Sequence, residues 1–494
     1  IKHFAANNQE TNRFLLDVTV SERALREIYL RGFEIAVKES QPWAVMSAYN
    51  GINGTYASQH AGILTSVLRE EWAYDGLVMT DWFAGDDPVA QLRAGNDLLM
   101  PGMAERTELI RTAVESGDLR EDELDVNVAR ILRLIFRSPA QAGYVYSNQP
   151  DLAGHASIAR AAATESTVLL RNVDSTLPLS HDIRTVVAFG NTSYEFIAGG
   201  AGSGDVNEAY TVSLVEGLEA AGFSVEDELR SRYAAFITAE KAKLPEKKFW
   251  FELLPPIPEM PVEEDLLARM AAKSEAALIT IGRNSGEFKD REVDGDFELT
   301  DAERVLIDSV ANMFHAQQKP VIVILNIGNV IETVSWRNQV DAIVLPWQGG
   351  QEAGNAVADV LTGKVNPSGK LPTTFPLHYS DVPSADSFPG INLSEEEVFG
   401  INGIPLGKES KVEYREGIFV GYRYYDTFDI ESGYPFGHGL SYTRFEIMVA
   451  DYKEAVGDGG QVGVAVTVRN LGDAAGKEVL QLYVSAPEST LPKP

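Results

Sequence analysis

Apolar and polar positions follow two different patterns along the first 140 residues. Short apolar runs end in polar residues at 43–50, 76–82 and 96–101, which predicts strands. Apolar residues at three- and four-residue spacing predict helices at 19–39, 63–72, 88–95, 105–116 and 121–137. Strands that alternate with helices indicate a parallel sheet, and several such units in a row favour a (β/α) barrel. We expect residues 1–140 to form the C-terminal part of such a barrel.

A second α/β region is expected at 158–380, after a looser linker at 141–157. Its strand candidates are short and almost continuously apolar, as strands buried on both faces should be, at 185–190, 276–282, 320–328 and 341–347. Thr300 with Glu303 forms a capping box at the start of a helix, and Thr19 with Glu22 forms another in the first region. The pattern predicts an α/β domain with a mostly parallel sheet.

The last part of the chain has a different pattern. Residues 381–430 are rich in proline, glycine, serine and glutamate, which indicates an extended connection. Alternation with turn signals at 445–453 and 461–487 predicts antiparallel strands of a β-sandwich. An immunoglobulin-like sandwich needs about seven strands. We therefore expect residues 431–494 to form an incomplete sandwich, and both ends of the chain to lie inside larger domains.

Composition narrows the classes of function. The chain has 494 residues, and its 72 acidic against 42 basic residues give a net charge of −30. This charge disfavours nucleic acid and anionic membranes as partners. The absence of cysteine excludes disulfides and thiol nucleophiles. We find no long apolar run and no paired histidines, so we expect a soluble protein without a metal site, of unassigned compartment.

Asp81 is the first candidate for chemistry. It ends the apolar run at 76–82, and active-site groups of β/α barrels lie at the carboxyl ends of strands. Trp82 beside it offers a flat apolar wall, and a carboxylate next to an aromatic platform suits a sugar. The alternative is structural: Asp81 would cap the next helix, and Trp82 would lie in the core.

Four more polar residues share this placement at strand ends or in the loops that follow. Lys2 and His3 lie where a first strand meets its loop, Arg13 ends that loop, and Tyr49 ends the run at 43–50. Each alone also has a structural interpretation: Arg13 as a surface charge, Tyr49 as a core residue with an exposed hydroxyl. Their shared position predicts a pocket rich in hydrogen-bond donors around Asp81.

A hydrolase of the two-carboxylate type needs a second acid. Glu287 and Asp290 both follow the apolar run at 276–282, and the residues alone leave the choice between them open. Glu287 also has a structural interpretation, as a solvated acid paired with Lys289 or Arg291.

The glycine-rich stretch GGAGSGD at 199–205 resembles a phosphate-binding loop. However, the third glycine of the dinucleotide fingerprint is replaced by Asp205 or Asn207, depending on the register, and no P-loop lysine follows. A nucleotide-binding α/β protein is therefore a weak alternative.

Several motifs together resemble glycoside hydrolase family 3, in its β-glucosidase branch. They are KHFAANNQETNR (2–13), VMSAYN (45–50), VMTDWFAG (78–85), SGEFKDR (285–291), VNPSGKLPTTFP (365–376) and GIFVGYRYYDTF (417–428). The resemblance implies a (β/α) barrel, an α/β sandwich and a fibronectin type III-like domain. It also implies exo-acting hydrolysis of β-glucosides with retention of configuration, no cofactor, and a small β-glucoside or oligosaccharide as substrate. Homo-oligomer formation stays open.

The resemblance also implies a role for each candidate residue. Asp81 matches the nucleophile, and Glu287 rather than Asp290 matches the acid/base, so a cleft between domains is expected. The residues that match sugar-binding positions are Lys2, His3, Arg13, Tyr49, Trp82 and Ser203.

The resemblance comes with one sequence difference that separates two branches of the family, one departure from the family pattern and two alternative functions. KHFAANN differs from the KHFPGHG form of the N-acetylglucosaminidase branch, which disfavours a hexosaminidase. The family carries a barrel segment ahead of the K-H motif, which by resemblance supplies further contacts to the sugar. We expect this segment to come from a partner, or this chain to be part of a longer protein. The alternatives are a β-xylosidase or broad exo-β-glycosidase, and a truncated, inactive carbohydrate-binding remnant.

Overall fold

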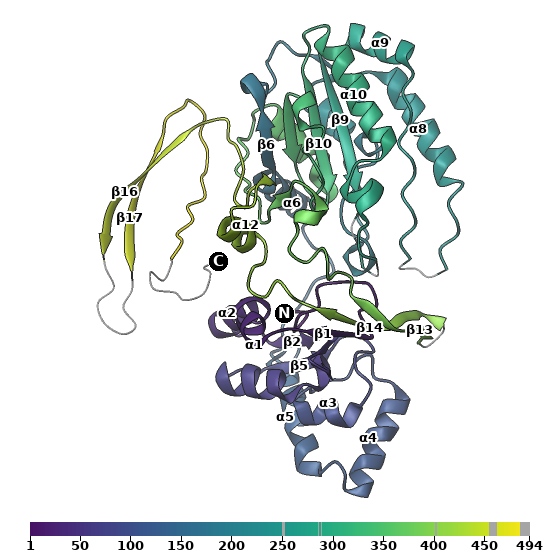
Figure 1. Cartoon of the computed structure of the whole chain (residues 1–494), viewed down its shortest axis with the longest axis vertical. Coiled ribbons are helices and arrows are strands. Elements are labelled where there is room, and N and C mark those ends of the chain that lie inside the picture. Colours follow the sequence, from purple (N-terminus) through teal and green to yellow (C-terminus); the bar gives the residue numbers. More distant parts are fainter. Residues whose placement is uncertain (249–251, 285, 288, 401–402, 454–461, 485–494) are drawn as a thin grey trace. The chain divides into compact units, whose positions relative to one another are not determined.

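The computed structural model describes the chain except for residues 249–251, 285, 288, 401–402, 454–461 and 485–494. Contacts divide it into two units (Figure 1). Unit 1 contains residues 1–150 and 382–424, and unit 2 contains residues 151–381 and the described residues between 425 and 484. No helix among the described residues has both the length and the apolar character needed to cross a membrane.

Parallel strands form the centre of unit 1, as the apolar runs predict. β2 (Ala44–Ser47) pairs in parallel with β5 (Leu77–Thr80). Parallel bridges extend this pair on both sides, from Phe4 to Ser47 and from Met79 to Leu98. The predicted third strand at 96–101 contributes only that bridge. The described residues of unit 1 form no closed barrel, but they do place four extended segments side by side with the same direction.

Helices cover this parallel core in unit 1. Their bounds are α1 (Glu22–Ala24), η1 (Leu25–Tyr29), α2 (Arg31–Ser40), η2 (Ala57–Gln59), η3 (Gly62–Glu71), α3 (Pro88–Ala94), α4 (Ala104–Ser116) and α5 (Glu121–Arg137). The predicted capping box of Thr19 with Glu22 is wrong. Thr19 ends β1 (Leu16–Thr19), where it pairs with a neighbouring strand, and the Ser21 hydroxyl accepts the N–H of Ala24 at 3.2 Å instead. Strand pairing therefore shifts the helix start by two residues.

A five-stranded sheet is the second part of unit 1. Its order is β13 (Ile391–Phe399), β14 (Pro405–Glu413), β1, β3 (Gly51–Ile52) and β4 (Thr55–Tyr56). The expected extended connection at 381–430 instead contains the antiparallel hairpin β13–β14, whose second strand pairs in parallel with β1. Most side chains of β13 are exposed. The hairpin therefore lacks the apolar alternation by which a strand is recognised in sequence.

Unit 2 contains a six-stranded sheet, and four of its strands match the predicted apolar runs. In spatial order the six strands are β6 (Val168–Asn172), β11 (Ala342–Leu345), β10 (Val321–Ile327), β9 (Ala276–Arg283), β7 (Thr185–Phe189) and β8 (Ser224–Val225). The four that match are β7, β9, β10 and β11. Every pair is parallel except β6 with β11. Alternate residues of each central strand enter two separate hydrophobic cores, one on each face of the sheet. Burial on both faces explains the continuous apolar runs.

Helices pack on both faces of this sheet (Figure 1). One face carries α8 (Asp227–Lys241), α9 (Glu264–Lys273) and α10 (Asp301–His315), and the other carries α7 (Leu214–Ala220) and α11 (Ala353–Leu361), with α6 (Leu152–Ser166) against α11. The capping box of Thr300 with Glu303 is confirmed at the start of α10. The expected linker at 141–157 ends earlier, because Asp151 caps α6 through the N–H of Gly154 at 2.9 Å.

The rest of unit 2 consists of short elements and one hairpin. The short helical turns are η4 (Val173–Ser175), η5 (Asn191–Ser193), η6 (Gly202–Gly204), η7 (Val293–Phe297), η8 (Arg337–Gln339), η9 (Gly350–Glu352) and η10 (Tyr379–Asp381). α12 (Tyr422–Phe428) spans the boundary between the units, and β12 (Phe375–Pro376) pairs with β15 (Ser432–Tyr434). The predicted sandwich is represented by one antiparallel pair, β16 (Phe445–Lys453) with β17 (Gly463–Asn470). The predicted stretch 461–487 forms one strand, β17, and its described residues 478–484 form none.

Candidate active site

Asp81 lies directly after β5, at the carboxyl end of the parallel strands of unit 1. Its N–H donates to the carbonyl oxygen of Ser47, the last residue of β2, at 3.1 Å. The side-chain Oδ1 accepts the N–H of Trp82 at 2.8 Å, and the residue is 8% exposed. The backbone therefore fixes the position of this carboxylate, while a small part of it stays open to a ligand.

His3 supplies the nearest side-chain partner of Asp81. Its Nε2 lies 3.2 Å from Oδ2 of Asp81. The neighbouring Phe4 is fixed against β2 by two backbone hydrogen bonds, to Met46 and from Ala48. An imidazole Nε2–H donates to a carboxylate whether the ring is neutral or charged. His3, at the start of the first loop, thus contacts Asp81, as the sequence predicts.

Arg13 and Tyr49 form a second contact in the same unit. The Arg13 guanidinium lies 4.7 Å from the centre of the Tyr49 ring, and Nη1 of Arg13 lies 2.9 Å from Oε2 of Glu10. Arg13 is only 4% exposed, so its interpretation as a surface charge is wrong. The ring of Phe14 packs on Tyr49 with centroids 4.3 Å apart. A buried guanidinium between an aromatic face and a carboxylate is a rigid arrangement.

Lys2 and Trp82 present their side chains to the surface of unit 1. Lys2 is exposed and directly precedes His3. Trp82 is 52% exposed, so the alternative that places it in the core is wrong. Its ring meets that of Phe83 edge to face, with centroids 6.2 Å apart. A large exposed aromatic next to a nearly buried carboxylate is typical of a carbohydrate platform, because the apolar face of a sugar can pack on it.

Glu287 lies in unit 2, in the loop that follows β9. Its Oε2 accepts two hydrogen bonds from Ser203, one from the N–H at 2.7 Å and one from the hydroxyl at 2.6 Å. The cations that offered a structural interpretation of Glu287 have other partners: Lys289 pairs with Glu292, and Arg291 pairs with Asp296. Glu287 therefore meets the glycine-rich loop, a contact that the sequence analysis did not predict.

The structure thus joins six of the predicted site residues in three pairs through side-chain contacts, and it divides all eight between the two units. Unit 1 joins His3 to Asp81 and Arg13 to Tyr49, and unit 2 joins Ser203 to Glu287. The members in unit 1 are Lys2, His3, Arg13, Tyr49, Asp81 and Trp82, and those in unit 2 are Ser203 and Glu287.

Distant residues that the sequence analysis missed hold the loop carrying Arg13. The hydroxyl of Tyr414 donates to the carbonyl of Ala6 at 3.0 Å, and Nε2 of Gln9 donates to the carbonyl of Pro389 at 3.0 Å. Oδ1 of Asn12 accepts the N–H of Lys408 at 2.9 Å. The partners of each bond lie about 400 residues apart in sequence, so no local pattern could have revealed them.

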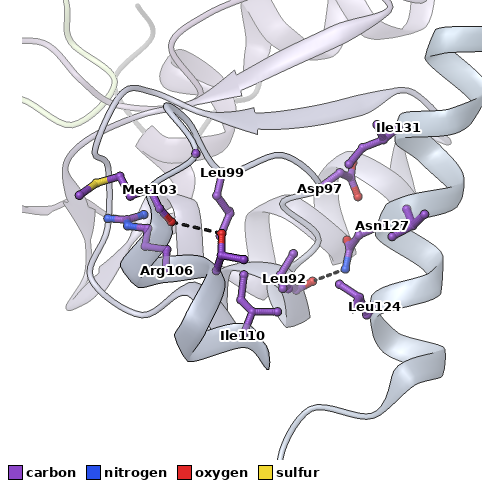
Figure 2. A pocket seen from close by; sticks show the side chains of 12 residues that line it. Leu92, Asp97, Leu99, Met103, Arg106, Ile110, Leu124, Asn127 and Ile131 are labelled. Carbon is purple, nitrogen blue, oxygen red and sulfur yellow. Dashed lines mark hydrogen bonds between the residues drawn. The ribbon is translucent and has the colours of Figure 1, made fainter. Parts of the chain in front are cut away.

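A small cavity of about 210 Å³ lies among α3, α4 and α5 in unit 1 (Figure 2). Aliphatic side chains line most of it, including Leu92, Ile110 and Ile131. Its one carboxylate, Asp97, has no exposed side-chain surface and pairs with Arg69 at 2.7 Å and with Arg130 at 2.9 Å. None of the predicted site residues lines this cavity, and its buried ion pairs have a structural role.

A larger cavity of about 860 Å³ lies in unit 2 at the carboxyl ends of β7 and β9. One part of its lining is the leucine- and proline-rich segment 253–258, and another is Arg283 with its two hydrogen bonds to Glu303 at 2.6 and 2.7 Å. Gly286, next to Glu287, also lines it. The chain runs from β7 to β8 on one side of β7 and then crosses to β9 on its other side, so the strand order reverses at β7. Ligands of open α/β sheets bind at such a reversal.

Comparisons with known families match both parts of the chain. Residues 1–134 match the model of the glycosyl hydrolase family 3 N terminal domain, and residues 167–422 match that of the glycosyl hydrolase family 3 C-terminal domain. The chain belongs to glycosyl hydrolase family 3.

Relatives in this family carry glycosidase names. Thermostable beta-glucosidase B of Acetivibrio thermocellus is 39% identical over all of this chain and 60% of its own length. An exo-alpha-(1->6)-L-arabinopyranosidase of Bifidobacterium longum is 33% identical with the same coverage. The structure of beta-glucosidase 3B from Thermotoga neapolitana in complex with glycerol is similar with a TM-score of 0.87 and 49% identity, covering 96% of this chain and 65% of that one. This family 3 chain therefore spans about 60% of the length of these curated relatives.

Proposed function

We propose that this protein is a retaining, exo-acting β-glucosidase that removes terminal β-D-glucosyl residues from small glucosides or oligosaccharides. The observation that carries the proposal is the Asp81 carboxylate: it is nearly buried at the carboxyl end of a parallel strand, lies 3.2 Å from His3 and adjoins the exposed ring of Trp82. Family membership and the β-glucosidase names of relatives support glucose as the sugar.

The proposed reaction is a double displacement with two carboxyl groups. The ionised carboxylate of Asp81 attacks the anomeric carbon and forms a glycosyl ester. At the same time the glycosidic bond breaks, and Glu287 gives its proton to the leaving oxygen. A water molecule then attacks the anomeric carbon, the ester bond breaks, and Glu287 takes up the proton of that water. The enzyme returns to its starting state, and glucose leaves with its original configuration.

Neighbouring side chains fit the two roles. The hydrogen bond from Trp82 N–H and the contact from His3 keep Asp81 oriented for attack. The stack of Arg13 on Tyr49 forms a rigid donor-rich wall in the same unit. The cavity beside Gly286 is suited to the part of the substrate beyond the cleaved bond, because the acid must reach the leaving oxygen and the leaving group therefore passes next to Glu287.

Azide rescue of two alanine variants tests both assignments. Small nucleophiles replace a missing carboxylate, and the face from which azide attacks reveals which carboxylate is gone. We expect Asp81→Ala to lose at least about 10³-fold in kcat/KM and to yield α-glucosyl azide. We expect Glu287→Ala to lose activity mainly on substrates with poor leaving groups and to yield β-glucosyl azide. A β-glucosyl azide from Asp81→Ala would sink the nucleophile assignment.

Two other functions have a specific observation behind them. The arabinopyranosidase name of a relative with 33% identity favours testing other exo-glycosidase specificities, including β-xylosides. The exposed ring of Trp82 beside Asp81 favours testing a carbohydrate-binding role without turnover. Initial rates on matched aryl β-glucosides, β-xylosides and α-arabinopyranosides decide the first question. Glucose binding by calorimetry without hydrolysis would support the second.

A further inference from the structure

We propose that the glycine-rich loop 199–205 positions the Glu287 carboxyl group, and that Ser203 determines which of its two oxygens carries the proton. This inference rests on the proposed role of Glu287 as acid and base. It gives Ser203 a role different from the sugar contact that the family resemblance implies, namely that of a positioning residue.

Both hydrogen bonds from Ser203 end on the same oxygen of Glu287. The N–H donates to Oε2 at 2.7 Å, and the hydroxyl donates to Oε2 at 2.6 Å. A protonated carboxyl group has one carbonyl oxygen, which accepts two hydrogen bonds, and one hydroxyl oxygen, which carries the proton. Two donors at Oε2 make it the carbonyl oxygen of the acid form. The proton then lies on Oε1.

This arrangement specifies the proton transfers of the proposed reaction. Oε1 gives its proton to the leaving oxygen in the first step and receives the proton of water in the second. Oε2 accepts hydrogen bonds from Ser203 throughout, and Ser203 keeps its own protons. The carboxyl group is thereby held in one orientation, which a general acid needs because it must reach the reacting oxygen at hydrogen-bond distance.

The backbone of the loop is shaped for this contact. Gly202 has a φ of +66°, and a Cβ on it would overlap Cβ of Glu287 and lie 2.7 Å from its Oε2. Ala201 forms a parallel bridge with Gly286, where a Cβ would overlap the side chain of Ala201. By contrast, a Cβ on Gly204, in the same helical turn as Gly202, would meet no atom within 4 Å. The sequence GSG therefore contains one glycine that the contact requires and one that it does not.

Substrates that differ only in their leaving group separate positioning from sugar binding. A 2,4-dinitrophenyl β-glucoside departs without protonation, whereas a phenyl β-glucoside needs the acid. For Ser203→Ala we expect kcat/KM to fall about tenfold on the phenyl glucoside and less than about twofold on the dinitrophenyl glucoside, as the loss of one charge-assisted hydrogen bond suggests. Inhibition by glucose should stay unchanged. Ser203→Thr keeps a hydroxyl and should restore most of the phenyl glucoside activity.

Gly202→Ala and Gly204→Ala form a matched pair. We expect Gly202→Ala to lose about 100-fold on the phenyl glucoside, because its Cβ displaces the carboxyl group, and to lose much less on the dinitrophenyl glucoside. Gly204→Ala should stay within about twofold on both. Circular dichroism and thermal unfolding of each variant show whether the loop change is local.

Two results would overturn the inference. Equal losses of kcat/KM on both glucosides with weaker inhibition by glucose would show that Ser203 contacts the sugar. Unchanged kinetics of Ser203→Ala would show that the contact has no role in turnover. Both results leave the proposed function standing. That function fails separately if Glu287→Ala shows no dependence on the leaving group.

Discussion

Glu259 is expected to make the stability of unit 2 depend on pH. Its carboxyl oxygens accept the N–H of Asn191 at 3.0 and 3.2 Å, and Oε1 accepts the N–H of Met260 at 2.9 Å. Burial raises the pKa of Glu259 from 4.5 to about 7, and these hydrogen bonds offset only part of that rise. The side chain of Glu259, which directly follows the segment 253–258, thus connects that segment to the loop after β7 through hydrogen bonds.

The sign of the effect follows from the raised pKa. Between about pH 4.5 and pH 7 the folded protein holds a proton on Glu259 that the unfolded chain has released, so stability falls as the pH rises through this window. A pKa difference of about 2.5 units corresponds to about 3.4 kcal/mol. Above about pH 7 the stability that the protonated Glu259 contributes is lost completely, and below about pH 4.5 it is fully present.

Glu259→Gln removes this titration and keeps an acceptor at the same place. Between pH 4.5 and pH 7 we expect the free energy of unfolding of the variant to change by about 3.4 kcal/mol less than that of the wild type. Because two units can unfold separately, hydrogen exchange of β7 and α8 is the suitable measurement. Glu292→Gln, an exposed acid paired with Lys289, serves as control and should keep the wild-type slope. Identical slopes for Glu259→Gln and wild type would refute the reasoning.

Further predictions concern backbone geometry and a buried ion pair. A Cβ on Gly190, at φ +92°, would overlap the Thr280 carbonyl, whereas a Cβ on Gly222, at φ +96°, would meet no atom within 4 Å. We therefore expect Gly190→Ala to lower the stability of unit 2 by at least about 3 kcal/mol and Gly222→Ala to lower it by about 1 kcal/mol. Denaturant unfolding measures both changes. Burial favours a higher pKa for Asp359, but hydrogen bonds from Arg160 and Lys364 outweigh it and lower the pKa. Asp359→Asn should therefore cost about 3 kcal/mol at pH 7, and this cost should shrink as the pH falls through the lowered pKa; an undiminished cost in acid would contradict the assignment.

The sequence predicted the parts of the fold that a strong local pattern encodes. Strands β7, β9, β10 and β11 are buried on both faces, so their apolar runs are continuous and have no competing interpretation. The position of Asp81 followed from similar logic, because it is the first charged residue after an apolar run. The start of the first helix was predicted wrongly at Thr19, because Thr19 pairs with β14 and Ser21 caps the helix instead.

Contacts between distant segments were beyond the reach of the sequence. The hairpin β13–β14 has mostly exposed side chains and pairs with a strand almost 400 residues earlier. Ser203 and Glu287 are 84 residues apart, and neither is unusual in its local context. The exposure of Trp82 could not be predicted either, because a tryptophan after a buried strand is equally compatible with core packing.

Trapping the covalent intermediate tests the central claim most directly. A 2-deoxy-2-fluoro-β-glucoside with a dinitrophenyl leaving group forms the glycosyl ester but hydrolyses it slowly, since fluorine destabilises the positively charged transition state. Peptide mapping by mass spectrometry then locates the attached sugar. Our account predicts one fluoroglucosyl group per chain, on the peptide that contains Asp81, and none in Asp81→Ala. A label on another residue, or turnover without any label, would contradict it.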